Sequence, residues 1–294
     1  MSDSRTLTNT LGGHWHGYYG TAPCPVCQPE HRKDQNALTL RDGEDGRLLL
    51  HCKRLGCAFR TILRAVTIAP GAYQRPHPAD LLKRKETAKA EAAKKSAQAE
   101  GLWREAQPIT GTIAETYMHE VRGITCALPD TLRFHPSCWH GPSASRQPAL
   151  VAIVEGSHGF AVHRTYLRRD GSAKAALKPN KMMLGSTRGG GVRLSEGMGS
   201  LIVGEGIEST LSAFVQFGEP VARAWASLST SGMRALRLPK QPARLIIAPD
   251  GDAAGHAAAL SLKNRGRREG WSVSVLAPPP GGDFNDLMNS EVLS

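Results

Sequence analysis

Two pairs of closely spaced cysteines lie near the start of the 294-residue sequence. The first pair is Cys24 and Cys27, in a C-P-V-C segment, and the second is Cys52 and Cys57, in a C-K-R-L-G-C segment. One Zn²⁺ accepts four thiolates in a tetrahedron, and each close pair supplies two of them. The spacing therefore predicts one structural zinc ion held by these four cysteines.

Strand-like composition on both sides of a glycine-rich turn separates the two cysteine pairs, which is the layout of a zinc ribbon. We therefore expect a β zinc ribbon over residues 14–66. His31 or His51 stands as an alternative ligand in place of one cysteine. The two strand-like stretches and the turn between them are residues 36–40, 47–51 and 42–46.

Basic and aromatic residues surround the cysteines. Lys53 and Arg54 lie inside the second pair, and side chains of both kinds together suit phosphate contacts and base stacking on a single strand. The alternative is that the metal only holds a small domain together, because such a module has little core of its own. The other members of the set are His14, Trp15, His16, Tyr18, Tyr19, Arg60 and Arg64.

Three acidic residues follow two apolar stretches in the last third of the chain. Glu205 follows residues 201–204, and Asp250 and Asp252 follow residues 245–249. Because the carboxyl ends of parallel strands meet at one rim of a sheet, we expect these side chains to lie close together. Like charges at such a rim need a cation, and carboxylate oxygens suit Mg²⁺ or Mn²⁺. The three acids are therefore predicted to bind Mg²⁺ or Mn²⁺.

Each of these acids also has a structural alternative. An isolated Asp-Gly-Asp segment is often a turn, and Asp252 is expected to cap a helix that begins at Ala253. Glu208, three residues after Glu205, is expected on the surface of a helix.

The elements that must position the acids read as alternating strands and helices. Helix-like stretches at 207–217 and 253–269 alternate with short apolar runs, which predicts βαβ units and a mostly parallel sheet flanked by helices. Two apolar runs farther upstream flank a glycine-containing turn and predict an antiparallel hairpin. The apolar runs are residues 150–154, 160–167, 201–203, 245–248 and 273–276.

The linker between the cysteines and this α/β region has two parts. Residues 70–78 are rich in proline and should belong to neither a helix nor a central strand. Residues 80–105 favour an exposed, basic helix, with tracking along DNA as a less favoured role. The predicted division is a zinc ribbon, a basic linker and helix, a basic α+β subdomain and an α/β domain that carries the three acids, over residues 14–66, 67–107, 108–197 and 198–294.

The composition limits the partners. The formal net charge is +11 and the pI is about 9.6, which favours polyanions. The N-terminal segment has no apolar core typical of a signal peptide, and no stretch approaches the ~18 apolar residues of a membrane helix. We therefore expect a cytosolic protein in which Cys126 and Cys138, which fit no metal spacing, are simply buried.

The two acidic segments, G-E-G-I-E-S-T-L-S-A and I-I-A-P-D-G-D-A-A-G, resemble the two signatures of the Toprim domain. Toprim domains occur in bacterial-type primases, in type IA and II topoisomerases, and in OLD-type nucleases. The resemblance implies a general acid/base or metal-organising role for Glu205 and metal ligation by Asp250 and Asp252. Residues 284–287, F-N-D-L, are similar to the segment that often closes this domain in phage and plasmid primases.

Residues 163–185, upstream of the acids, resemble the basic segment that precedes Toprim in those primases. A zinc ribbon, this segment and Toprim in the same order imply a DNA primase that uses NTPs on a single-stranded DNA template in phage or plasmid-type replication. The predicted phosphate- or template-binding residues of the segment are Arg164, Lys174, Lys178 and Lys181.

Three other functions are alternatives to a primase. A metal-dependent Toprim nuclease reuses the same acids, and a non-catalytic DNA-binding adaptor recruits a helicase. A topoisomerase is disfavoured because the chain has five tyrosines and little room for a gate domain. Residues 185–191 are glycine-rich but lack the lysine of a phosphate loop, so a replicative helicase is expected as a separate chain.

Overall fold

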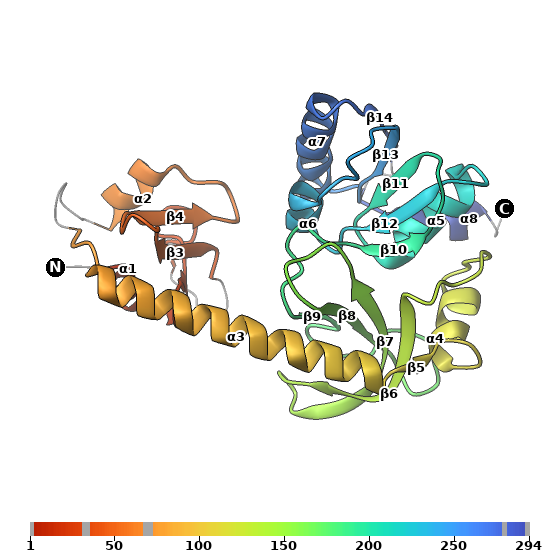
Figure 1. Cartoon of the computed structure of the whole chain (residues 1–294), viewed down its shortest axis with the longest axis horizontal. Coiled ribbons are helices and arrows are strands. Elements are labelled where there is room, and N and C mark those ends of the chain that lie inside the picture. Colours follow the sequence, from red (N-terminus) through yellow and green to blue (C-terminus); the bar gives the residue numbers. More distant parts are fainter. Residues whose placement is uncertain (1–2, 31–35, 67–72, 278–280, 292–294) are drawn as a thin grey trace. The chain divides into compact units, whose positions relative to one another are not determined.

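The computed structural model describes residues 3–30, 36–66, 73–277 and 281–291 (Figure 1). The chain forms two compact units, Met1–Ala93 and Lys94–Ser294. Within the described residues no helix is long and apolar enough to span a membrane.

The first unit is built around a small antiparallel sheet in the order β1-β2-β3-β4. The longest pairing joins β3 and β4, where Leu38 lies opposite Cys52 and Asp42 lies opposite Leu48. A small apolar core, with Leu38, Leu40 and Ile62 fully buried, lies against the sheet. The elements are α1 (Ser4–Thr10), β1 (His14–Trp15), β2 (Gly20–Ala22), β3 (Leu38–Asp42), β4 (Leu48–Cys52) and α2 (Phe59–Ala65).

Helix α3 (Pro78–Glu105) begins in the first unit and ends in the second. It is mostly exposed, as its Ala-, Lys- and Glu-rich composition predicts, and it buries only Ala99 fully. The helix starts at Pro78, the last residue of the predicted connector. Proline is tolerated there because the first turn of a helix needs no backbone N–H. Residues 70–72 of the predicted connector lie outside the described residues.

An antiparallel five-stranded sheet, in the order β5-β6-β7-β8-β9, opens the second unit. The predicted hairpin is confirmed, since β7 and β8 pair antiparallel from Ala149↔Tyr166 to Val154↔Ala161. A short helix and a π-helical turn connect β5 to β6. The elements are β5 (Gln107–Pro108), α4 (Ile113–Thr116), η1 (Tyr117–Val121), β6 (Leu132–His140), β7 (Ser145–Val154), β8 (Ala161–Tyr166) and β9 (Lys181–Leu184).

The second sheet of this unit has the order β10-β12-β11-β13-β14 and is the predicted α/β element. Its last four strands are parallel, and β10 pairs antiparallel at one edge. The strands are β10 (Val192–Ser195), β11 (Leu201–Gly204), β12 (Arg223–Ala226), β13 (Arg244–Ala248) and β14 (Ser272–Val275).

Helices cover both faces of this sheet (Figure 1). Leu201 and Val203 pack with α6 and α7, whereas Ile202, between them, packs with α5 and α8. This alternation follows from the two-residue period of a strand. It also explains why the strands read as continuous apolar runs. The helices are α5 (Ile207–Phe217), α6 (Thr230–Ala235), α7 (Ala253–Arg268) and α8 (Phe284–Glu291).

Candidate functional site

The acids lie at the carboxyl ends of the two central strands of the parallel sheet. Gly204, at the end of β11, lies opposite Ala248, at the end of β13, so the chain reaches Glu205 and Asp250 at the same rim. Burial, followed by the negative charges of Asp250 and Asp252, raises the pKa of Glu205 to about 7. The charges of these acids therefore act on one another, as expected from their positions after neighbouring strands.

A fourth acid, Asp283, faces Asp250. Burial is the largest cause of the raised pKa of Asp250, and the charge of Asp283 is the next. The backbone brings Asp283 there, because Gly251 N–H donates to Gly282 O at 2.8 Å and Gly281 N–H donates to Gly251 O at 3.2 Å. The segment predicted from the sequence was residues 284–287, which leaves out Asp283. The signal for it was the aspartate that begins the D-F-N-D-L segment.

Asp252 lies at the N-terminus of α7, where its side chain accepts a hydrogen bond from Gly255 N–H at 2.6 Å. The predicted cap is therefore confirmed. Its side chain is exposed, and a ligand role beside the cap stays a prediction. Among the described residues, the carboxylates are not gathered within 4.8 Å of one another as the cysteine thiols are.

The backbone beside Glu205 is strained. Leu228 follows β12 and has a φ of 69°, a conformation that a leucine rarely adopts. Its N–H donates to Glu205 O at 2.8 Å, and the backbone N–H of Thr230 partly offsets the rise in the pKa of the Glu205 side chain. Such strain is commonly kept where it fixes a functional group.

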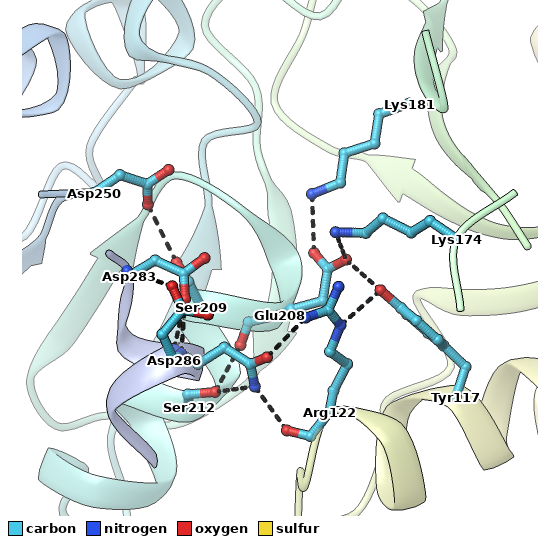
Figure 2. A network of polar contacts seen from close by, with 11 residues as sticks. Tyr117, Arg122, Lys174, Lys181, Glu208, Ser209, Ser212, Asp250, Asp283 and Asp286 are labelled. Carbon is cyan, nitrogen blue, oxygen red and sulfur yellow. Dashed lines mark hydrogen bonds and ion pairs between the residues drawn. The ribbon is translucent and has the colours of Figure 1, made fainter. Parts of the chain in front are cut away.

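Glu208 is buried, so its predicted place on the helix surface is wrong. Its side chain is only 5% exposed and forms ion pairs with Lys174 Nζ at 3.0 Å and Lys181 Nζ at 3.2 Å (Figure 2). Burial opposes its charge, but Lys181 and Lys174 outweigh burial and hold the pKa of Glu208 far below its usual range. The periodicity of the helix did not predict this burial, because both lysines lie in or just before β9, which belongs to the antiparallel sheet.

A polar network extends from Glu208 to the last helix (Figure 2). Tyr117 O–H donates to Glu208 Oε1 at 3.1 Å, and Arg122 Nε–H donates to the Tyr117 hydroxyl at 2.8 Å. Asn285 Nδ2 donates to Arg122 O at 2.6 Å and to Ser212 Oγ at 3.0 Å. The π-helical turn, α5 and α8 are thereby joined close to the acids.

The four basic residues predicted upstream of the acids lie in different surroundings. Lys181 Nζ is 3.8 Å from the place a Cβ would take on Gly206, and its charge lowers the pKa values of Glu205 and Asp250. Lys174 shares Glu208 with it, and Lys178 is exposed.

Arg164 does not present its charge to solvent. It is 7% exposed and donates to Trp139 O at 3.2 Å and to Met183 O at 3.3 Å. Its guanidinium bonds to the backbone of β6 and β9 from β8, so its position does not support the predicted phosphate contact.

The four thiols of Cys24, Cys27, Cys52 and Cys57 all lie within 4.8 Å of one another, with Cys27 Sγ and Cys52 Sγ 3.5 Å apart. Four sulfurs bound to one Zn²⁺ at about 2.3 Å are separated by about 3.8 Å, so the cluster has the size of a tetrahedral zinc site. Burial works against the Cys52 thiolate, but backbone N–H groups at Leu55, Cys57 and Arg54 lower its pKa to about 6. The residues thus fit zinc.

The remaining residues predicted for the zinc module lie around this cluster. Lys53 and Arg54 are exposed, and Arg54 donates to Cys27 O at 2.8 Å, which joins the two cysteine pairs. His51 is exposed on β4, opposite Thr39. His31 lies outside the described residues.

Two family models match the sequence. Residues 93–194 match a domain of unknown function, DUF7146, and residues 200–292 match the Toprim domain. The parallel sheet and its helices are therefore a Toprim domain. A search of curated proteins gave no significant match.

Several solved structures are similar to the chain. The zinc-binding and RNA polymerase domains of the Aquifex aeolicus primase are 15% identical, with a TM-score of 0.42 over 100% of this chain and 84% of that one. A DNA primase domain from Pseudomonas aeruginosa is 18% identical, with a TM-score of 0.33 over 59% of this chain and 54% of that one. The primase fragment of the bacteriophage T7 primase-helicase protein is 16% identical, with a TM-score of 0.30 over 49% and 63%.

Proposed function

We propose that this protein is a DNA primase that joins NTPs into short RNA primers on single-stranded DNA, in replication of the phage or plasmid type. The observation that carries the proposal is the rim of the Toprim domain, where Asp250 acts on Glu205, Asp283 acts on Asp250, and Lys181 lies beside them. Acids and a cation placed together suit a reaction in which phosphate is held and a proton is removed.

The reaction forms a bond between the primer 3′-oxygen and the α-phosphorus of an NTP, and it breaks the bond from that phosphorus to pyrophosphate. A pKa of about 7 lets Glu205 accept the hydroxyl proton near neutral pH. Lys181 and Lys174 together carry one positive charge more than the Glu208 carboxylate between them, and this charge and the exposed Lys178 would attract the triphosphate.

Asp250, Asp252 and Asp283 would hold Mg²⁺ or Mn²⁺ beside Glu205, since hard oxygen ligands and an excess of negative charge fit these ions. The ion would supply Lewis-acid stabilisation of the charge that develops on the departing pyrophosphate. In this proposal the zinc module holds the template through Lys53 and Arg54, and a replicative helicase is a partner.

The test is to incubate the full-length protein with single-stranded DNA, NTPs and Mg²⁺ or Mn²⁺, and to resolve the products on a gel. Wild type is expected to make primers, and Asp250→Ala is expected to lose at least ~100-fold in rate because a ligand and its charge are removed. Asp130→Ala, a change at an exposed acid of the same unit, should keep wild-type activity.

Two outcomes would contradict the proposal. Template degradation without primers, lost in Asp250→Ala, would identify a Toprim nuclease, in which water replaces the primer hydroxyl. DNA binding with neither activity would identify an adaptor.

A further inference from the structure

A basic cleft lies beside the outer strands of the Toprim sheet, apart from the acids. It consists of a hollow of 740 Å³ and a neighbouring hollow of 680 Å³, which share the wall formed by residues 237–240. The first hollow is lined by residues 195–198, which precede β11, whereas Glu205 follows that strand. Gly199 N–H donates to Val221 O at 2.9 Å, before β12 begins, so the part of the hollow around Met198 lies at the amino ends of the parallel strands, whereas the acids lie at their carboxyl ends. Trp225, on the same hollow, lies level with Val203 in the middle of the sheet.

Six cations and two acids line the cleft. Within the described part of the chain, the cations at 223, 234, 237 and 240 have no carboxylate within 4.0 Å. The acids are Glu196 and Glu269, and Glu269 already pairs with Arg265 at 3.1 Å. The six cations are Arg193, Arg223, Arg234, Arg237, Lys240 and Arg265.

Most of these cations are arginines, whose planar guanidinium groups match the two oxygens of a phosphate. The Nε atom of Arg223 is buried and has no partner in the described structure, although its other end donates to Gly199 O at 3.0 Å. Arg237 and Lys240 are exposed on the shared wall. The cleft is thus positively charged and largely uncompensated within this unit.

Apolar groups lie among the charges. Met198 is 88% exposed and lines the first hollow. Trp225 lines the same hollow with the Arg193 guanidinium 5.2 Å from its ring centre. Unpaired bases expose flat aromatic faces that can stack on such side chains. In a duplex these faces are covered by neighbouring base pairs, and an acidic peptide offers little apolar surface.

We propose that this cleft binds a single strand of nucleic acid, with the phosphates on Arg237, Lys240 and Arg223 and the bases against Met198 and Trp225. The inference goes beyond the proposed function, because binding here requires neither the acids nor primer synthesis.

The test uses the full-length protein and a fluorescent oligothymidylate of about 20 nucleotides, with anisotropy measured from about 50 to 200 mM salt. The double variant Arg237→Glu, Lys240→Glu should weaken binding about tenfold. It should also flatten the log–log salt dependence by about 1.4, because two phosphate contacts are lost. The matched control, Arg267→Glu with Arg268→Glu, reverses two exposed charges on α7 outside the cleft. It should leave the dissociation constant within about twofold of wild type and the salt slope unchanged.

A second readout locates the strand. An oligonucleotide carrying 5-iodouracil should cross-link on irradiation to the peptides that contain Met198 and Trp225. Equal weakening in both double variants, or cross-links only elsewhere, would overturn the proposal. So would tighter competition by a polyglutamate peptide than by the oligonucleotide, which would assign the cleft to an acidic protein. Asp250→Asn should bind the strand like wild type even if no primers are made, which separates this inference from the proposed function.

Discussion

Glu205 is a carboxyl group whose surroundings oppose its charge. Burial and the aspartates raise its pKa to about 7, from the ordinary glutamate value of 4.5. Between these two values the unfolded chain is ionised at this site while the folded protein is not. Raising the pH through this window therefore favours the unfolded chain, and the penalty is complete above about 7.

We expect Glu205→Gln to be more stable than wild type in metal-free buffer at about pH 8, and to lose most of this advantage at about pH 5. The difference in unfolding free energy should change by about 1 kcal/mol between these pH values, because solvent screens part of the effect. Urea unfolding measures it. Glu120→Gln, at an exposed acid, should follow wild type. Parallel curves for wild type and Glu205→Gln would show that Glu205 is not repelled by its neighbours.

At the scale of elements, the first turn of α5 is fixed by charges from outside the Toprim domain. Glu208 is the second residue of α5, and its partners are Lys174, in the loop before β9, and Lys181, the first residue of β9. The same helix begins directly after Glu205 and Gly206. The ion pairs therefore position the rim as well as the helix.

Glu208→Gln should lower the unfolding free energy by about 3 kcal/mol, because it leaves two partly buried ammonium groups without a counter-charge. Since the pKa of Glu208 is lowered on folding, its contribution is present above about pH 4.5 and is lost on acidification, so the difference should shrink at low pH. Glu219→Gln breaks the exposed pair with Arg244 and should cost under about 0.5 kcal/mol. Urea unfolding measures both changes. Equal losses of unfolding free energy in the two variants would show that the Glu208 ion pairs are not a buried, stabilising network.

At the scale of the whole molecule, the two compact units have different sources of stability. The second unit has several large apolar cores, one of them shared by its two sheets. The first has one small core beside the cysteine cluster, and a domain of this kind depends on its metal.

We expect one zinc per chain by atomic absorption and almost none in Cys57→Ser. Chelation should unfold the first unit, seen as rapid proteolysis before residue 66, while the thermal transition of the second unit is unchanged. Cys126→Ser, a change at a cysteine of the second unit, should retain the zinc. A metal-free first unit that resists protease would show that its core suffices.

Local features of the sequence predicted much of this protein. The spacing of the four cysteines alone predicts their cluster, because each pair lies on a single tight turn. Glu205 and Asp250 follow apolar runs, and the strands they end are neighbours in one parallel sheet, so both acids reach the same rim. The β7–β8 hairpin and the capping of α7 by Asp252 depend on adjacent residues and were also predictable.

The tertiary structure decided what depends on residues far apart in the chain. Glu208 is buried because Lys174 and Lys181, from before and within β9, meet it there. Arg164 is buried with its guanidinium against carbonyl groups of Trp139 and Met183, far from it in the chain. Asp283 reaches Asp250 through backbone bonds between residues 251 and 281–282. A periodic pattern shows which side of an element is apolar. It does not show which distant charge will cover the other side, since that is fixed only when the elements pack.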